Sequence, residues 1–330
     1  MNAPTPPAEA NTETYSYLGP AGTFTELALK QVKEAEGKPW RAVNNVGEAL
    51  DDVVSGRSTA AVIAIENSID GGVSATQDAL ATVPGLRIIG EYLVPVGFVL
   101  VARPGVKLED VRTIAAHPVA YAQCRGWLDR NLPDHAHLPA GSNVQAATQL
   151  LERDGETGAP TSPADAAIAP PTIVDHHALA VLAEDIIDNP HAVTRFALVS
   201  RGRAVPAPTG ADKTSLIAEL PTDRPGSLVE LLEQFSTRGV NMSMLESRPI
   251  GDGTGRHRFI IDLEGHIGEE RIADALLGLY RFTPRVIFLG SYPRAIREQT
   301  EFDRRYADEV FVEARDWLRG LLAAEPDPAS

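Results

Sequence analysis

The chain has 330 residues, of which 43% are hydrophobic and 23% charged, an ordinary composition for a globular protein. This length favours two domains, each with its own core. A formal net charge of −15 argues against non-specific binding to nucleic acid or to an anionic membrane surface. No apolar run is long enough to cross a bilayer, and the single Cys124 excludes an intramolecular disulfide, which fits a reducing cytoplasm.

Residues 1–13 are rich in Pro, Ala and Thr and have neither a basic start nor an apolar core. We therefore expect a disordered lead here and no secretory signal. Beyond it, strand-like and helix-like segments alternate, which is typical of a doubly wound α/β lobe. The pattern predicts strands at residues 15–18, 40–43 and 60–65, and helices from residue 24, at 47–55 and at 74–81.

A second α/β rhythm follows an extended stretch at residues 91–102. We expect one domain over residues 14–202, with a first lobe at about 14–103 and 193–202 and a second lobe at about 104–192. Ligands of such sheets bind outside the carboxyl ends of the strands, so we expect a cleft between the lobes that closes over a ligand. In the second lobe the pattern predicts strands at 113–116, 135–139 and 166–169, and helices at 119–131 and 143–152.

Residues 203–212 are rich in Pro, Gly and Ala, which predicts a linker. The order of elements beyond it is the βαββαβ unit of a ferredoxin-like domain, expected over residues 213–293. Residues 294–330 are expected to hold an amphipathic helix from about residue 298 to 322 and a frayed tail. The predicted strands of the ferredoxin-like unit lie at 214–220, 241–249, 257–264 and 285–290.

Two loops of the first lobe carry residue types suited to an anionic ligand. Residues 19–24 combine glycines, which let backbone N–H groups approach a ligand, with a helix N-terminus, which attracts anions. A plain strand-to-helix turn stays open for this loop. Residues 66–68, Glu-Asn-Ser, follow a buried strand, so their side chains are aimed at the cleft. A capping turn for the next helix, or a buried Glu66 that bonds loop amides, stays open.

Thr194, Arg195 and Phe196 form a third group at the mouth of a strand-like segment. A hydroxyl beside a guanidinium suits a small, oxygen-rich anion. Arg195 could hold a carboxylate through two hydrogen bonds, and Thr194 could donate a hydrogen bond or a proton to a leaving hydroxyl. Taken alone, such a triplet is more often an ordinary strand start, so its meaning depends on the other two loops.

Together, residues 17–25, residues 65–71 and the triplet at 194–196 resemble the signature loops of prephenate dehydratases, in the same order and spacing. Residues 116–124 resemble the loop and helix of that family's second lobe. The C-terminal unit resembles the regulatory ACT domain of those enzymes, and its segments 225–229 and 246–249 resemble the two phenylalanine-binding motifs. The resemblance covers about residues 15–293.

The resemblance implies a two-lobed, periplasmic-binding-protein-like α/β catalytic domain followed by a ferredoxin-like ACT domain. The implied reaction converts prephenate to phenylpyruvate with loss of carbon dioxide and water, in phenylalanine biosynthesis. Aromatisation of the ring drives it, so no cofactor and no metal are expected. L-phenylalanine is the implied feedback effector. We expect a cytoplasmic homodimer or homotetramer formed through ACT domains, without nucleic-acid or membrane partners, and a monofunctional enzyme, since no chorismate mutase segment is evident.

The resemblance also assigns roles to individual residues. Thr194 would assist the departure of the 4-hydroxyl as an acid or hydrogen-bond donor, Arg195 would anchor an anion, and Phe196 would pack beneath the site. The implied substrate-binding residues are Thr23, Asn67, Ser68, Gln123, Arg195 and Phe196. The implied phenylalanine-binding residues are Pro225, Gly226, Ser227, Leu228, Asn241, Glu246, Ser247, Arg248 and Pro249.

Four positions depart from the family's usual pattern. Ala192 stands where the family usually has Asn, Pro170 replaces a Ser, the pair at 177–178 is His-Ala instead of Tyr-Gly, and Ser227 replaces an Ala. The first three lie in the second lobe or at the return crossover, so they allow a shifted preference, for example for arogenate. They also leave open a non-catalytic ligand sensor on the same fold. Ser227 adds a hydroxyl near the expected effector.

Three further features have simpler explanations. Adjacent residues on a helix point in different directions, so His176-His177 is expected to be a pair of surface histidines and not a metal site. Cys124 lies on a predicted helix, and we expect a small buried residue there, not a nucleophile. Glu246 and Arg248 alternate on a strand, which also fits a plain edge-strand charge pattern.

Overall fold

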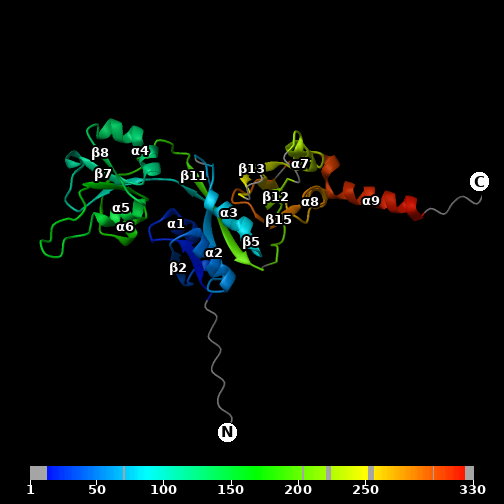
Figure 1. The fold of residues 1–330 in the computed structure, drawn as a ribbon, viewed down its shortest axis with the longest axis horizontal. Coiled ribbons are helices and arrows are strands. Elements are labelled where there is room, and N and C mark those ends of the chain that lie inside the picture. Colours follow the sequence, from blue (N-terminus) through cyan, green and yellow to red (C-terminus); the bar gives the residue numbers. More distant parts are fainter. Residues whose placement is uncertain are drawn as a thin grey trace, which may run out of the picture. The chain divides into compact units, whose positions relative to one another are not determined.

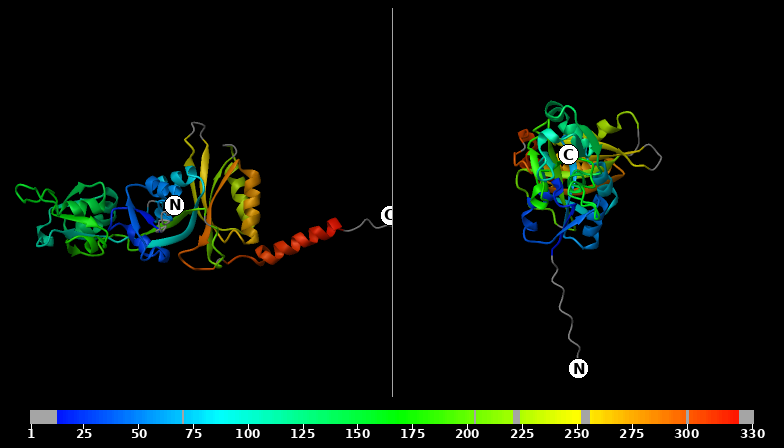
Figure 2. Two further views of the ribbon diagram at one scale, coloured as in Figure 1. Left: turned by 90° about the horizontal axis from the view of Figure 1, so that it is seen from below. Right: turned by 90° about the vertical axis from the view of Figure 1, so that its left-hand side faces the viewer.

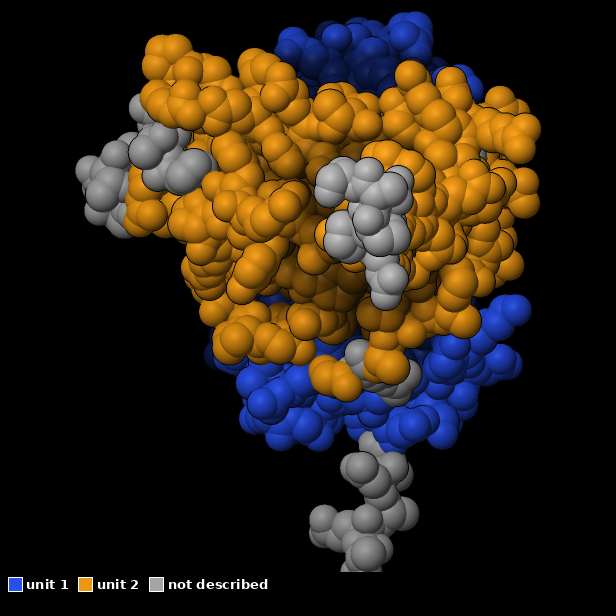
Figure 3. All heavy atoms as spheres, turned by 90° about the vertical axis from the view of Figure 1, so that its right-hand side faces the viewer, with its two compact units in different colours: residues 1–79, 92–201 blue, residues 80–91, 202–330 orange. Residues whose placement is uncertain are grey.

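The computed structural model describes residues 13–69, 71–202, 204–220, 224–251, 256–299 and 301–323. The chain divides into two compact units, which Figure 3 shows in different colours. The first unit comprises Met1–Ala79 and Tyr92–Arg201, and the second comprises Leu80–Glu91 and Gly202–Ser330. Almost all of the expected N-terminal lead and all of the expected frayed tail lie outside the described residues.

The first lobe is built on a six-stranded sheet (Figure 1). Five of its strands follow the order β2-β1-β3-β11-β5. The short strand β4 pairs with β3 and lies outside this order. β1 runs parallel to β2 and β3, whereas β11 runs antiparallel to β3. The strands are β1 (Tyr15–Leu18), β2 (Trp40–Val43), β3 (Ala60–Asn67), β4 (Gly71–Gly72), β5 (Leu86–Pro95) and β11 (Val193–Arg201), and the helices are α1 (Phe24–Lys30), α2 (Val46–Ser55) and α3 (Ser74–Thr82).

β3 is the strand around which this lobe is organised. Its first four residues, 60–63, are buried, as expected of a strand covered on both faces. Asn45 caps the first turn of α2, and Gly56 ends this helix in the left-handed conformation. β3 continues two residues beyond the predicted end because Glu66 and Asn67 pair with both β11 and β4.

The second lobe has its own five-stranded sheet, in the order β10-β6-β9-β7-β8. Its core joins apolar residues of the sheet to α4, with Ile114, Cys124, Leu128 and Ile168 fully buried. The two-lobed α/β arrangement expected from the sequence is confirmed. The elements of this lobe are β6 (Val99–Ala102), β7 (Thr113–Ala116), α4 (Pro118–Asn131), β8 (Ala136–Pro139), α5 (Asn143–Gln149), β9 (Ala166–Ala169), α6 (Ile173–His176) and β10 (Ala180–Ala183).

The chain enters the second lobe earlier than the sequence indicated. The stretch at residues 91–102 was expected to be one extended segment of the first lobe. It holds the end of β5, which neighbours β11, and all of β6, which pairs with β9 and β10. The crossing therefore lies between Pro95 and Val99 and not near Arg103. Pro95 and Gly97 interrupt the stretch at this point, and they are the sign in the sequence of a change from one sheet to another.

The second unit contains the expected ferredoxin-like βαββαβ fold. Its sheet has the strand order β13-β14-β12-β15. α7 and α8 pack on one face of this sheet, where Leu231 and Phe235 of α7 join Ile272 and Leu279 of α8 in one buried core (Figure 2). The elements are β12 (Asp212–Glu219), α7 (Ser227–Ser236), β13 (Met242–Pro249), β14 (His257–Glu264), α8 (Glu270–Phe282) and β15 (Arg285–Pro293).

Residues 80–91 belong to this second unit although they precede it by more than a hundred positions. Lys213 Nζ on β12 lies 2.9 Å from Glu91 Oε2, and both side chains are buried. The second carboxylate oxygen of Glu91 accepts a hydrogen bond from the Ala295 amide at 2.9 Å. At Gly290 a Cβ atom would collide with the backbone of Ile88, so this position requires glycine.

The last helix, α9, spans Asp308–Ala323 and starts about ten residues later than predicted. Its residues are exposed or half-buried, including Trp317 and Leu321. A single turn of 3₁₀ helix at Arg304–Tyr306 precedes it. In the part of the chain that the structure describes, no helix is long and apolar enough to cross a membrane.

Candidate active site

The end of β3 and the start of β11 bring together polar residues that are more than 120 positions apart. In this antiparallel pair Thr194 faces Asn67, and Arg195 faces Glu66. Residues directly opposite each other share a face of the sheet, and successive residues point to opposite faces. The Thr194 hydroxyl and the Arg195 guanidinium therefore point to opposite faces of the sheet. The sequence indicated instead that the two groups lie side by side.

The hydroxyl of Thr194 is oriented by Asn67. Asn67 Nδ2 donates to Thr194 Oγ1 at 3.1 Å, and Asn67 Oδ1 accepts the Ile69 amide at 2.8 Å. The second bond fixes which end of the carboxamide is the donor, because only the oxygen can accept from an N–H group. Thr194 thus accepts a hydrogen bond from Asn67 and keeps its own proton for another acceptor.

Ser68 is held in a comparable way just beyond β3. Its Oγ accepts the Val193 amide at 2.9 Å, and its own amide donates to the Val193 carbonyl at 2.9 Å. These two bonds extend the β3–β11 ladder past the end of the strand. Because Ser68 Oγ acts as an acceptor toward the backbone, its proton is also available to a ligand.

Arg195 is engaged by Glu66. Arg195 Nε lies 2.9 Å from Glu66 Oε2, and the arginine side chain is 7% exposed whereas that of Glu66 is 36% exposed. A guanidinium that is almost buried requires such a counter-charge. The pair ties β11 to β3 one residue away from the Thr194–Asn67 contact. Phe196 follows on β11 and is buried.

The loop at residues 19–23 is held by its own helix. Thr23 is the N-cap of α1: its hydroxyl donates to the Leu18 carbonyl at 3.2 Å and accepts the Glu26 amide at 3.4 Å. The Gly22 amide donates to the Glu26 carboxylate. These contacts make the loop a strand-to-helix turn in which Gly22 and Thr23 bond within the protein, so it can border a cleft but does not offer these groups to an anion.

Gln123 and Cys124 lie on α4 in the second lobe. Oε1 of Gln123 is buried and has no hydrogen-bond partner among the described residues, and the Gln123 carbonyl accepts the Asp188 amide at 2.8 Å. A buried acceptor without a partner is costly unless a ligand or water completes it. Burial, assisted by nearby Asp188, raises the pKa of Cys124 to about 12, so the expectation of an inert buried thiol is confirmed.

The departure at Ala192 has a packing explanation. Ala192 is fully buried in the core of the second lobe, together with Val96 and Ile186. Its carbonyl accepts the Val96 amide at 2.8 Å. The side chain thus faces apolar neighbours, where an unpaired amide would be unfavourable.

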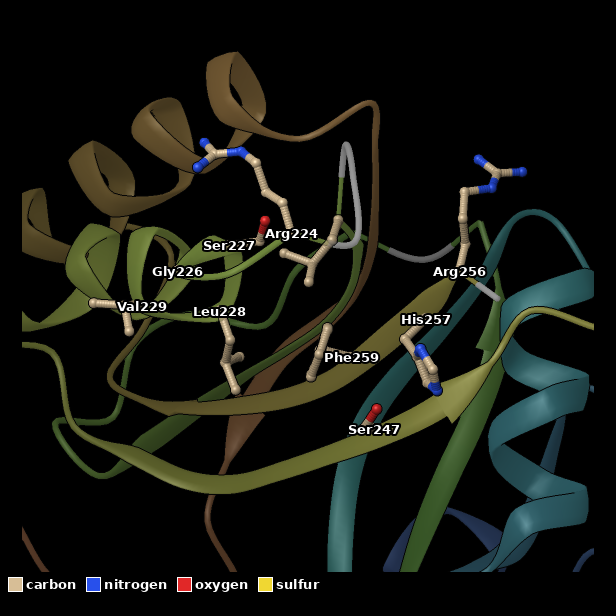
Figure 4. A pocket seen from close by; sticks show the side chains of 10 residues that line it. Arg224, Gly226, Ser227, Leu228, Val229, Ser247, Arg256, His257 and Phe259 are labelled. Atoms are coloured by element: carbon tan, nitrogen blue, oxygen red, sulfur yellow. The ribbon is translucent and has the colours of Figure 1, made fainter. Parts of the chain in front are cut away.

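A second candidate site is a cavity of about 340 Å³ in the C-terminal unit (Figure 4). Leu228 at the start of α7 and Phe259 on β14 point toward it, and Ser247 lies on the neighbouring strand (Figure 4). The cavity joins apolar side chains to cationic ones, which suits a ligand with an apolar body and a carboxylate. Its lining residues are Leu220, Arg224, Gly226, Ser227, Leu228, Val229, Ser247, Arg256, His257 and Phe259.

Four of the nine residues predicted for the effector line this cavity: Gly226, Ser227, Leu228 and Ser247. Pro225, Asn241, Glu246, Arg248 and Pro249 are not among its lining residues. The alternation of β13 accounts for part of this, because Glu246 and Arg248 point to the face opposite Ser247. Phe259 and His257 also line the cavity, although no sequence pattern pointed to them, because the strand register places them opposite Ser247 and Pro249.

Comparison with known proteins finds a matching family model for each of the two parts of the chain. A family model described as prephenate dehydratase matches residues 15–204, and a model of the ACT domain matches residues 214–279. A prephenate dehydratase from Amycolatopsis methanolica is 41% identical over 311 residues, covering 94% of this chain and 98% of the relative. The chain belongs to the prephenate dehydratase family.

Solved structures of similar proteins agree with this family. A prephenate dehydratase from Arthrobacter aurescens in complex with L-Phe superposes with a TM-score of 0.88 at 49% identity, covering 94% of this chain and 100% of that one. A protein described as a quorum quenching acylase, GqqA, superposes with a TM-score of 0.74 at 30% identity, covering 86% and 99%. Since an acylase shares the architecture of the prephenate dehydratase family, the reaction must be argued from site residues and not from the fold.

Proposed function

We propose that this chain is a prephenate dehydratase regulated by L-phenylalanine, with Thr194 as its catalytic residue. The observation that carries the proposal is the oriented hydroxyl of Thr194, which accepts from Asn67 Nδ2 at 3.1 Å and retains its proton for a substrate. Family membership over residues 15–204 supports the choice of prephenate as substrate.

The reaction needs one proton and no redox partner. The ring carboxylate leaves as carbon dioxide, and its bonding electrons enter the ring. The electrons of the C–O bond leave with the 4-hydroxyl, which takes up a proton and departs as water. A threonine is a weak acid, so the Thr194 proton must move as the C–O bond breaks, or pass along as one link of a relay. Positioning and electrostatics supply the rest of the acceleration.

The neighbouring groups complete the proposed substrate site. Asn67 stabilises the charge that develops on Thr194 Oγ1, and the proton of Ser68 is directed to a substrate oxygen. The unpartnered Oε1 of Gln123 accepts a hydrogen bond from a substrate hydroxyl. Thr23 lines the loop side, and Arg195, whose guanidinium points to the other face of the sheet from Thr194, supports the site through its pair with Glu66.

In the proposed regulatory function, L-phenylalanine binds in the cavity of about 340 Å³ of the ACT domain. The complex of the Arthrobacter aurescens relative with L-Phe supports this ligand. The ring packs against Leu228 and Phe259, and the cationic side chains around the cavity offset its carboxylate. We include in the proposal a homo-oligomer formed through ACT domains and a cytoplasmic location, both in keeping with a family of biosynthetic enzymes.

The test is turnover of prephenate by the purified full chain, followed as phenylpyruvate absorbance with and without L-phenylalanine. The proposal predicts phenylpyruvate formation whose rate depends on L-phenylalanine. Folded protein that binds prephenate without forming product would instead be a ligand sensor. Parallel measurement of kcat/KM for arogenate decides which of the two substrates is preferred.

A further inference from the structure

The two lobes of the first unit touch directly at the loop that precedes α1. Thr172 Oγ1, just before α6 of the second lobe, donates to the Gly22 carbonyl of the first lobe at 3.1 Å. His176 Nε2, at the end of α6, lies 3.1 Å from Glu26 Oε2 at the start of α1. Both contacts join residues 150 positions apart, one at the loop and the other at the first turn of the helix that follows it.

Glu26 is the centre of this contact. Its side chain is 6% exposed, and its Oε2 binds both the His176 ring and the Gly22 amide. Lys30 Nζ, one helical turn further along α1, lies 3.8 Å from the other carboxylate oxygen. The carboxylate thus joins the backbone of the loop, through Gly22, to a side chain of the opposite lobe, through His176.

Gly22 packs close to α6 and has a backbone conformation that favours glycine. Gly22 has a φ of +88°, and a Cβ atom there would lie 3.3 Å from Ile173 Cδ1 and 3.8 Å from the His176 ring. Phe24, two residues on, packs edge-on against Phe98 of the second lobe, with ring centroids 5.6 Å apart. The loop and the start of α1 therefore contact the second lobe by packing as well as by hydrogen bonds.

We propose that His176 and Thr172 are positioning residues, which latch the loop at residues 19–23 onto the second lobe in the conformation that binds substrate. The latch acts through the Glu26 carboxylate and the Gly22 backbone. This inference rests on the proposed function, because the loop is one wall of the proposed prephenate cleft. A two-state cleft binds substrate with an affinity reduced by the fraction of molecules in the competent state, so losing the latch raises KM and leaves kcat nearly unchanged.

Four variants of the full chain test the latch. His176→Leu removes the ring nitrogen, whereas His176→Gln keeps an N–H donor that can reach Glu26. Thr172→Val removes the second bond without a change of shape. Asp175→Asn is the matched control, because Asp175 also bridges the lobes, 3.7 Å from Lys30, but its side chain is 57% exposed. An exposed ion pair contributes little, so this variant is expected to resemble the wild type.

Two readouts are compared for each variant: steady-state kinetics with prephenate, and amide hydrogen exchange of the peptide that covers residues 19–24. We expect His176→Leu and Thr172→Val each to raise KM about tenfold, with kcat within about twofold, and to speed exchange at Gly22 about tenfold. His176→Gln should restore both values to within about threefold of the wild type.

Unchanged exchange and KM in His176→Leu would overturn the latch. A His176→Gln variant as impaired as His176→Leu would also overturn it, because the N–H donor would then have no effect. An Asp175→Asn variant as impaired as His176→Leu would do the same, because the exposed ion pair would then matter as much as the His176–Glu26 contact. Exchange at Gly22 does not depend on turnover. If the wild type forms no phenylpyruvate, the proposed function fails while the exchange data still decide whether His176 holds the loop.

Discussion

Asn67 Nδ2 lies 3.1 Å from Thr194 Oγ1, and this contact across the β3–β11 pair decides the direction in which the threonine can donate. The carboxamide cannot be turned over without losing the bond from the Ile69 amide to Asn67 Oδ1. The Thr194 hydroxyl is therefore oriented before any substrate binds, as expected of a group that stabilises a transition state by preorganisation.

Replacing the amide donor should lower the rate more than the affinity. Asn67→Ala is expected to reduce kcat for prephenate about 100-fold, the usual cost of removing one preorganised donor, with KM changed less than about threefold. Asn131→Ala is the control, because Asn131 Nδ2 donates to the Trp127 carbonyl on an exposed helix face. Steady-state kinetics of the two variants check this. A normal kcat in Asn67→Ala would remove Asn67 from the account.

The Glu66–Arg195 pair should be coupled in stability. Removing either partner breaks this ion pair, so each of Glu66→Gln and Arg195→Gln is expected to lower the free energy of unfolding by about 1–3 kcal/mol. The double variant should lose less than the sum, with a coupling energy of about 1–2 kcal/mol. Urea unfolding of the four proteins measures this. Strict additivity would show that the pair does not support the strands.

Asp52 should make the first lobe sensitive to acid. Burial alone would raise the pKa of this carboxyl, but hydrogen bonds from Arg57, Ser16 and Arg41 outweigh it and hold the pKa below its usual range. A depressed folded pKa adds stability that is complete above the unfolded pKa, about 3.9, and is lost as the pH falls through the folded value. Stability should therefore fall in this acidic window and not near neutrality.

The variant Asp52→Asn tests that assignment. At pH 7 it is expected to lower the free energy of unfolding by about 1–2 kcal/mol, because two half-exposed guanidinium groups lose a charged partner. The loss of stability toward acid pH should also become smaller. Asp51 precedes it on α2 and is exposed, so Asp51→Asn should change stability by less than about 0.5 kcal/mol. Equal effects of the two variants, measured by urea unfolding from pH 3 to 7, would contradict the prediction.

Cys124 should be unreactive while the chain is folded. With a pKa of about 12, raised by burial and by nearby Asp188, only about one thiol in ten thousand is ionised at pH 8. A colourimetric thiol reagent should therefore find no accessible thiol in the native protein and one per chain after unfolding in guanidinium. Rapid stoichiometric labelling of native protein would show that the second-lobe core opens.

Ser227 should contribute directly to effector binding. Its Oγ is buried against the ACT cavity and has no hydrogen-bond partner within the described part of the chain. If the ligand supplies the missing partner, Ser227→Ala should weaken L-phenylalanine binding about fivefold in calorimetry, the value of one neutral hydrogen bond. Ser236→Ala, at the exposed end of α7, is the control. Unchanged or tighter binding by Ser227→Ala would exclude this role.

Much of the fold could be predicted from the sequence because its signals are local. The apolar run at 60–65, the strands at 15–18 and 166–169 and the βαββαβ order all follow from residue patterns over a few positions. The crossing between Pro95 and Val99 is marked in the sequence only by Pro95 and Gly97, which break a strand without telling which sheet the next strand joins. Glu91 and Lys213 look like ordinary solvated charges in the sequence, and only packing between distant segments buries them as a pair.

The residue types of the candidate site could be predicted from the sequence, but the side-chain pairs that they form could not. The loops at 66–68 and 194–196 were identified from residue types, yet the partner of each side chain depends on strand register and on the irregularity between Arg195 and Phe196. The alternation of successive residues along β11 separates Thr194 from Arg195. His176 was expected to be a surface residue, and its contact with Glu26 follows from a fit of two lobes that no local pattern encodes.

In the proposed mechanism the Thr194 hydroxyl donates to the departing hydroxyl of prephenate. The most direct test compares wild type with Thr194→Val, which keeps the shape and removes the proton, in turnover to phenylpyruvate and in calorimetric binding of prephenate. We predict loss of kcat by at least about 1,000-fold with the dissociation constant changed less than about fivefold. A Thr194→Val variant that turns over prephenate within about tenfold of the wild type would contradict the account.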